Sequence, residues 1–190
     1  LDIGLKYLLN EALSSYMKFE VNVMVLSGYT DYVGSLRNPP GQPYGSHTSR
    51  TVNNIIDFDL KVKRYHQLDN RFIINYGLGL GYRYWERILS VSQVEIYEWY
   101  SLRAMLGMNF KLTNKFKLGT EFEYQYGFNE TMSASDIGST FDLAGADILK
   151  FSIPLVYSYN DKMDFIASYV YEKQTIKESN HIPIGIHEYW

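Results

Sequence analysis

The sequence has no cysteine, only 5 prolines in 190 residues and no long apolar run. Without cysteine, disulfide scaffolds, thiolate catalysis and Cys-ligated zinc are excluded. A transmembrane helix is excluded too, because it needs roughly 18 or more consecutive apolar residues. An excess of either charge is also missing: 18 Lys and Arg stand against 21 Asp and Glu, a formal net charge of −3. This balance argues against a nucleic-acid partner, since binding phosphates requires clustered positive charge.

The chain is instead rich in tyrosine, with 18 residues, and in apolar and polar residues that alternate. In residues 72–84 every even position is apolar, and residues 116–126 nearly repeat the pattern. Successive side chains of a strand point to opposite faces, whereas a helix would space its apolar residues three and four apart. The sequence therefore predicts one all-β domain over residues 1–190. We expect eight strands, at about residues 1–9, 15–32, 54–65, 71–86, 97–112, 115–128, 146–159 and 164–176.

Short and long connections alternate between these strands, which is typical of an antiparallel up-and-down sheet. The long connections are expected at about residues 33–53, 87–96, 129–145 and 173–190. Most of the strands exceed the usual length in soluble proteins and suit a tilted crossing of a bilayer. Because open sheet edges do not persist in hydrocarbon, we expect the sheet to close into a barrel.

The polar stripe of the strands carries charges of both signs together with Gly77, Gly79 and Gly81. Small residues and mutually paired charges suit a narrow interior, so we expect this stripe to line the lumen and the apolar stripe to face lipid. The predicted charge network of the lumen comprises Lys18, Glu20, Asp57, Asp59, Lys61, Lys63, Arg83, Arg103, Lys117, Glu121, Glu123, Lys150 and Glu172.

Aromatic residues of the apolar stripe concentrate toward the strand ends, as expected for girdles at two membrane–water interfaces. The predicted girdles comprise Tyr82, Tyr84, Tyr100, Tyr124 and Tyr126 near the long connections, and Phe72, Phe110, Phe116, Tyr157 and Tyr159 near the short turns. The alternative is a soluble up-and-down barrel of the lipocalin type, in which the apolar stripe would point inward.

Segments such as NYGLGLGYRYWER and KFKLGTEFEYQYGF resemble the strands of small Gram-negative outer-membrane β-barrels of eight to ten strands. The resemblance is architectural, covers nearly the whole chain and implies a place in the cell outer membrane, with tight turns and both termini in the periplasm. The alternation of connections instead puts both ends of this chain at the long-loop side. We therefore expect a ten-stranded barrel of which this chain carries eight strands, the chain being processed or trimmed before Leu1; eight strands that close alone are the alternative.

Two acidic pairs, Asp57 with Asp59 and Glu121 with Glu123, have the spacing of catalytic dyads. Nearby lysines and arginines on the same stripe would keep these acids ionised and paired, so we interpret them as a structural lattice that fills the lumen. His181 and His187 give only a weak signal for a metal or a general base. No catalytic residue, no metal site and no cofactor is predicted.

The proline-rich connection is the candidate binding loop, with Pro39, Pro40, Pro43, Tyr44 and His47; a mobile exposed loop is the other interpretation. We expect outer-membrane lipid around the barrel and an extracellular or envelope protein as the candidate partner of the long loops. The predicted function is accordingly an outer-membrane β-barrel of structural or surface-interaction type.

Two alternatives remain for the function. One is a narrow channel for small solutes. The other is a surface hydrolase similar to the ten-stranded omptins, although no omptin motif is present. Its candidate residues near the long loops are Asp31, Glu86, Glu95, Glu98, Asp136, Asp142, Asp147, His181 and His187.

Overall fold

The structure is a computed structural model that describes residues 3–12, 16–34, 43, 45–136, 138–160, 163–177, 182–184 and 187–189. These residues form strands, turns and loops. Among them no helix is long and apolar enough to cross a membrane. The strands are β1 (Ile3–Ala12), β2 (Met17–Gly34), β3 (His47–Gln67), β4 (Phe72–Ile88), β5 (Val94–Lys111), β6 (Phe116–Ala134), β7 (Ser139–Leu143), β8 (Ala146–Asn160), β9 (Met163–Ile176), β10 (Ile182–Ile184) and β11 (His187–Tyr189).

Eight of these strands form one antiparallel sheet in the order β1-β2-β3-β4-β5-β6-β8-β9, with β7 paired to the end of β6. Each strand of this order pairs with its neighbour in the chain, apart from the short detour through β7. The predicted all-β, antiparallel up-and-down architecture with eight strands is therefore confirmed. β10 and β11 form a separate two-stranded hairpin.

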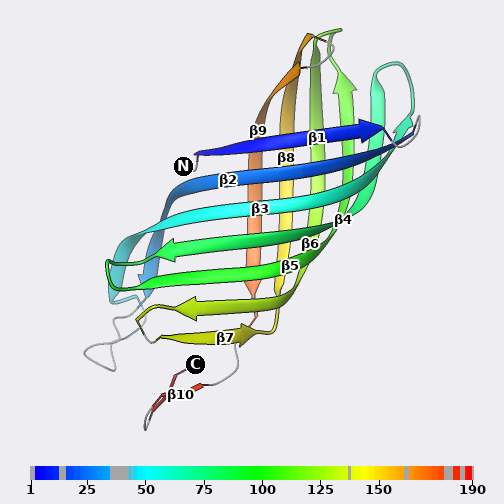
Figure 1. The fold of residues 1–190 in the computed structure, drawn as a ribbon. Helices are drawn as coiled ribbons and strands as arrows, with labels where there is room; N and C mark the ends of the chain where they lie inside the picture. The colour runs from blue at the N-terminus through cyan, green and yellow to red at the C-terminus, as the bar shows by residue number, and fades with distance from the viewer. Residues whose placement is uncertain are drawn as a thin grey trace.

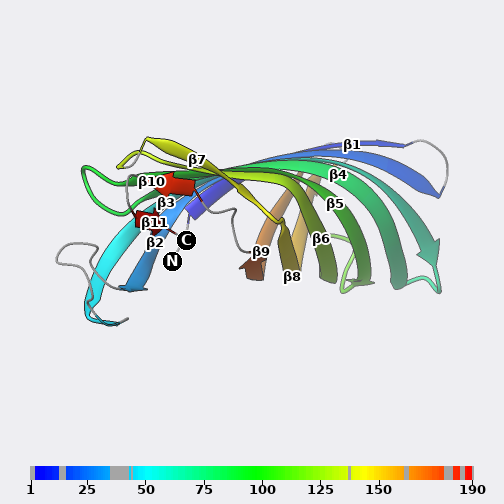
Figure 2. The same ribbon diagram turned by 90° about the horizontal axis from the view of Figure 1, so that it is seen from below.

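The sheet curls into a half-barrel with one concave face, which is visible as an arch in Figure 2. In Figure 1 the N-terminal strands cross the view almost at right angles to β8 and β9. Side chains of β3 reach β6, and a side chain of β4 reaches β9, although these strands are not neighbours in the sheet. We call the concave side the inner face and the convex side the outer face.

The strands are longer than the alternation predicted, so all four expected long connections are wrong in extent. Gly34 of β2 pairs with His47 of β3, which leaves only residues 35–46 between them. Residues 89–93 alone join β4 to β5, and the expected loop 129–145 contains the end of β6 and the whole of β7. The expected loop 173–190 begins inside β9 and includes β10 and β11. Backbone hydrogen bonds extend a ladder whether or not its side chains alternate in polarity, which explains the difference.

A β-bulge interrupts the ladder between β5 and β6. Glu98 pairs with Thr131 and Tyr100 with Phe128, so Trp99 faces two residues of β6, Asn129 and Glu130. Asn129 has a φ of 51°, in the left-handed region that non-glycine residues seldom adopt. The extra residue reverses the alternation of β6 beyond this point.

The two faces have inverted polarity compared with a water-soluble protein. Of the side chains that the structure describes, the fully buried ones are mainly polar or charged and lie on the inner face, for example Arg83 at 1% and Asp57 at 2% exposure. On the outer face Leu78 is 70% exposed and Leu106 59% exposed. A small apolar cluster of Tyr97, Trp99 and Ile148 lies on the inner face at the end where β7 packs.

Candidate functional site

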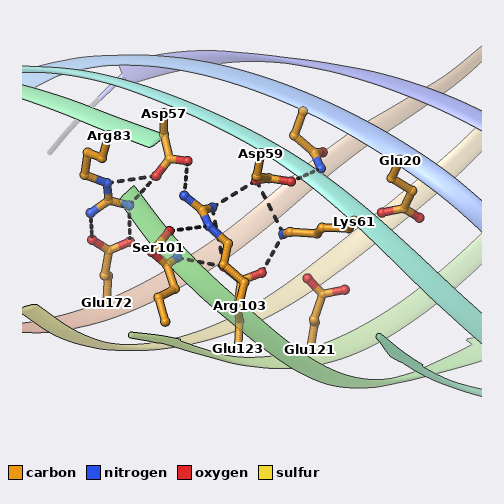
Figure 3. Close-up of polar contacts among 12 residues, drawn as sticks. Glu20, Asp57, Asp59, Lys61, Arg83, Ser101, Arg103, Glu121, Glu123 and Glu172 are labelled. Atoms are coloured by element: carbon orange, nitrogen blue, oxygen red, sulfur yellow. Dashed lines mark hydrogen bonds and ion pairs between the residues drawn. The ribbon is translucent and has the colours of Figure 1, made fainter. Parts of the chain in front are cut away.

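Arg103 of β5 is the centre of an ion-pair network on the inner face (Figure 3). Its guanidinium donates to Asp57 Oδ1 at 2.7 Å and to Asp59 Oδ2 at 3.0 Å, both on β3. A third carboxylate, that of Glu123 on β6, lies 3.7 Å from Nη1, and Ser101 Oγ accepts from Nε at 3.1 Å. One arginine of β5 thus reaches β3 across β4 and also contacts β6, its neighbour on the other side, because its planar fork can serve several acceptors at once.

A second set of pairs lies beside Arg103 and is built on two lysines of β3. The Lys61 ammonium donates to Glu123 Oε2 at 2.5 Å and lies 3.5 Å from Asp59. Lys63 Nζ lies 2.7 Å from Glu121 Oε2 and 3.1 Å from Glu20 Oε2 on β2. These pairs connect β2 and β3 to β6 across the hollow of the arch.

Arg83 of β4 connects the network to the last strand of the sheet. Its guanidinium donates to Asp57 Oδ2 at 2.6 Å and to Glu172 Oε1 of β9 at 2.5 Å (Figure 3). The same guanidinium lies over the ring of Trp99, 5.6 Å from its centroid. Asp57 therefore accepts from two arginines that come from adjacent strands, and an unbroken chain of pairs runs from Lys61 of β3 through Arg103 and Arg83 to Glu172 of β9.

Glycines of β4 provide the space in which these long side chains cross the sheet. A Cβ at Gly79 would lie 2.6 Å from the carbonyl oxygen of Leu60 and 2.8 Å from Cγ of Lys61. Cβ atoms at Gly77 and Gly81 would likewise meet Lys63 and Arg103. We call Gly77, Gly79 and Gly81 the glycine stripe. These positions must be glycine because the side chains of Lys61, Lys63 and Arg103 cross over β4 there.

The structure places the remaining predicted network residues on the same face with fewer partners. Lys18 lies over the ring of Tyr65, 5.2 Å from its centroid. Lys150 of β8 lies in register between Glu123 and Glu172, and Lys117 of β6 is half-buried. Neither Lys150 nor Lys117 belongs to an ion pair among the described residues. The pairs thus concentrate on Arg103 and Arg83, and of the residues outside them Lys18 and Lys117 lie toward the short turns while Lys150 lies beside the network.

The chemistry of this arrangement is structural. Each carboxylate of the Asp57–Asp59 and Glu121–Glu123 pairs contacts at least one buried lysine or arginine. A general acid or base must be able to exchange its proton with a substrate, and carboxylates held between several cations are poor candidates for that role. The network instead holds opposite walls of the arch together and occupies the space between them.

The predicted girdle residues lie on the outer face in two sets of ring contacts. Near the short turns Phe72 packs on Phe110 at 4.6 Å between centroids, and Phe116 packs on Tyr157 at 4.9 Å. At the opposite end Tyr82 packs on Tyr100 at 5.4 Å. The other predicted members are also at least partly exposed: Tyr84, Tyr124, Tyr126 and Tyr159.

The candidate binding loop falls largely outside the described residues, and so do Pro39, Pro40 and Tyr44. Pro43 is described and exposed, and its carbonyl oxygen accepts from the backbone N–H of Ser46 at 3.1 Å. His47 is the first residue of β3 and pairs with Gly34.

The residues proposed for a hydrolase do not form one site in the described part of the chain. Glu95 lies on the inner face and pairs with Arg87 at 3.0 Å, whereas Glu98 and Asp147 lie on the outer face. Glu86 accepts from Asn54 at 2.8 Å. His181 is outside the described residues, and His187 lies in β11. Nothing in the described residues therefore groups these acids around a histidine.

Sequence reasoning missed two features of the inner face. Trp85, Tyr97 and Trp99 share their parity with Arg83 and Arg103, so the alternation itself indicated that they point inward; Trp85 stacks on Tyr97 at 5.0 Å. Glu130 is 1% exposed and neither of its carboxyl oxygens has a hydrogen-bond partner among the described residues. Only the bulge reveals its inward direction, because strict alternation along β6 would put it outside.

The sheet and its network define an all-β protein built on a curled antiparallel half-barrel. No protein-family model matches the sequence, and no curated protein matches it. Among solved structures the chain is similar to the crystal structure of the Pseudomonas putida toluene transporter TodX, with 15% identity and a TM-score of 0.37. The match covers 88% of this chain and 53% of TodX, so the chain spans about half of that protein. A likeness of this size carries no argument about substrate or activity.

Proposed function

We propose that this chain forms most of the barrel of an outer-membrane protein of structural or surface-interaction type, with a lumen occupied by ion pairs. The observation that carries the proposal is the inverted polarity of the sheet. Charged side chains are buried on the inner face, while leucines such as Leu78, Leu80 and Leu102 are 70%, 55% and 52% exposed on the outer face.

Water is an unfavourable solvent for that outer face. Burying one leucine fully contributes roughly 1.5–3 kcal/mol, and the outer face leaves a continuous band of such residues uncovered. Hydrocarbon removes this penalty, and the aromatic residues at both ends of the band suit the two polar boundaries of a bilayer. Lipid is therefore the surrounding that best fits the outer face.

In hydrocarbon the sheet must also satisfy its edges. The described residues give β1 and β9 no partner on their far edges. Each unpaired backbone group would cost several kcal/mol in lipid, so closure requires that these strands pair with one another or with strands outside the described sheet. A ten-stranded barrel satisfies this requirement and fits our expectation from the alternation of connections.

The absence of cysteine permits a direct test with single spin labels. We expect labels at L78C and L102C, in vesicles, to be relaxed by oxygen, which partitions into hydrocarbon, and shielded from a water-soluble nickel chelate. A label at L68C, in the turn between β3 and β4, is the matched control and should show the opposite pattern, since Leu68 is 56% exposed at the expected water boundary. If all three labels met the nickel chelate equally, lipid would not cover the outer face.

Conductance separates the structural type from the narrow channel. Because Arg103, Arg83 and Lys61 fill the inner face with paired charges, we expect planar bilayers containing the protein to show no steady openings above background. Steady, solute-selective openings of the unmodified chain would favour the channel instead. If no openings are seen, the specificity of a surface-interaction protein would lie in the connections at the long-loop side, including residues 35–46.

A further inference from the structure

Two carboxylates of the outer face share one arrangement. Asp147 of β8 accepts a hydrogen bond from the hydroxyl group of Tyr124 at 2.5 Å, and Tyr126 of β6 is the register partner of Asp147. Glu98 of β5 accepts a hydrogen bond from the hydroxyl group of Tyr82, and Tyr84 of β4 is the register partner of Glu98. In both cases a Tyr-x-Tyr segment on the neighbouring strand places one tyrosine beside the acid and a second one diagonal to it.

At Asp147 this arrangement holds an ammonium group. Lys177 Nζ lies 3.1 Å from Asp147 Oδ2 and 5.4 Å from the ring centroid of Tyr126. The charge pair and the aromatic face act together, as is usual where a primary ammonium is recognised. Within the chain, a carboxylate next to a Tyr-x-Tyr segment therefore binds a primary ammonium group.

At Glu98 the corresponding cation is missing from the described residues. None of the ion pairs among them involves Glu98, whose hydrogen-bond partner there is the hydroxyl of Tyr82. In place of a lysine there is a hollow of about 340 Å³ beside the carboxylate. It is lined by Tyr82, Glu98, Trp99, Tyr100, Asn129 and Thr131.

The bulge explains why this hollow exists. Trp99 points to the inner face and Asn129 adopts a left-handed φ, so the ladder between β5 and β6 opens at this point. Tyr82 and Tyr100 form one wall, with their rings 5.4 Å apart, and continue into the apolar band through Leu80 and Leu102. Of the lining residues, Tyr82, Glu98 and Tyr100 lie on the outer face, at the end of the sheet where we place the bilayer boundary.

We propose that Glu98 and the hollow beside it bind the primary ammonium of a lipid headgroup, as found in phosphatidylethanolamine. This inference rests on the membrane location given under the proposed function. The Glu98 carboxylate receives the ammonium, the ring of Tyr100 covers it, and Asn129 and Thr131 provide amide and hydroxyl donors that suit the adjoining phosphate. The acyl chains then lie along the leucines of β4 and β5.

The test uses the full chain in vesicles that contain equal amounts of phosphatidylethanolamine and phosphatidylcholine. Both headgroups have the same net charge, but only the primary ammonium can donate a hydrogen bond to Glu98. Lipid that stays bound after gentle detergent extraction is measured by native mass spectrometry. We expect about a tenfold preference for phosphatidylethanolamine at one site, which corresponds to about 1.4 kcal/mol.

Two matched variants of outer-face carboxylates decide the outcome. Glu98→Gln should abolish the preference, whereas Asp147→Asn should keep it, because the ammonium at Asp147 is supplied by Lys177 of the chain. A preference that persists in Glu98→Gln would overturn the proposal. Millimolar ethanolamine that competes at Glu98 while no lipid preference is seen would also overturn it, in favour of a soluble amine. If the unmodified chain fails to enter vesicles at all, the proposed function fails as well, so the two failures are distinguishable.

Discussion

The inner and outer faces of the sheet differ sharply in polarity, although the same strands form both. On the inner face Arg103 is 2% exposed and contacts three carboxylates; one residue away, Leu102 is 52% exposed on the outer face. The backbone, the register and the strand are the same for both. The difference teaches that each face must be judged against the medium it contacts, since a buried charge needs partners and a continuous band of exposed leucines needs an apolar surrounding.

This contrast predicts that the inner face is sensitive to the loss of single partners. Arg103→Met should lower the free energy of unfolding by about 3–5 kcal/mol, because Asp57, Asp59 and Glu123 remain buried with fewer cations. The measurement is urea unfolding of the vesicle-reconstituted chain, followed by tryptophan fluorescence. Lys117→Met is the control on the same face and should change stability by less than about 1 kcal/mol. Equal losses for both variants would contradict a network centred on Arg103.

A charge introduced on the outer face should lower the stability of the chain in vesicles, whereas a charge introduced in a water-exposed turn should not. Leu78→Arg should cost about 2–4 kcal/mol in vesicles, since Leu78 lies between the two sets of aromatic residues. Leu68→Arg, in the turn after β3, should be close to neutral. The readout is the urea midpoint of each variant in vesicles. If Leu78→Arg were as harmless as Leu68→Arg, the convex side of the sheet would face water.

A methyl group added to a glycine that lies under the network should lower the free energy of unfolding by a smaller amount. Gly79→Ala should cost about 1–3 kcal/mol, because the new Cβ meets the backbone oxygen of Leu60, which cannot move without the ladder. Gly107→Ala is the graded comparison: its Cβ would meet the side-chain amide of Asn75 at 2.9 Å, which can rotate, and a backbone oxygen, that of Thr120, only at 3.1 Å instead of 2.6 Å. Unfolding in urea measures both. A larger loss at Gly107 than at Gly79 would show that the glycine stripe has another cause.

The smallest effect concerns pH and Glu130, which lies at the end of β6 beyond the bulge, outside the part of the strand that we propose to span the membrane. Burial of Glu130 raises the pKa of its carboxyl to about 7, from 4.5. The folded state therefore binds the proton more tightly than the unfolded state. The stability that this carboxyl contributes is full below about pH 4.5 and is lost as the pH rises through about 7.

Glu130→Gln should remove that part of the pH dependence and make the chain more stable than the unmodified protein at pH values above about 7. Urea unfolding at mildly acidic and mildly alkaline pH measures it. Glu123→Gln serves as a contrast, since it removes a paired carboxylate and should destabilise the chain. An unchanged pH profile in Glu130→Gln would mean that this carboxyl is not buried in the folded state.

Much of the fold followed from alternation, because period-two patterning of apolar and polar residues specifies both the strands and their two faces. It placed Asp57, Asp59, Lys61 and Lys63 on one stripe, and the structure has all four on the inner face. It did not predict how far the ladders extend, since Thr48 and Ser49 continue β3 through backbone hydrogen bonds alone.

Glu130 shows the limit of this reasoning. A single extra residue in β6 reverses the alternation, and the local sequence around Asn129 carries no strong signal for a bulge. The apolar cluster of Tyr97, Trp99 and Ile148 could have been found, because its strand parity matches that of the charged stripe.

The sequence by itself determined that every strand has one charged and one apolar face, since this depends only on the order of side chains along an extended chain. Which charges pair was decided by the tertiary structure alone. Lys61 and Glu123 are 62 positions apart, and Arg83 and Glu172 are 89 apart. These partners meet only because the twist of the sheet curls it into an arch and brings non-adjacent strands face to face across a space too narrow for unpaired charges.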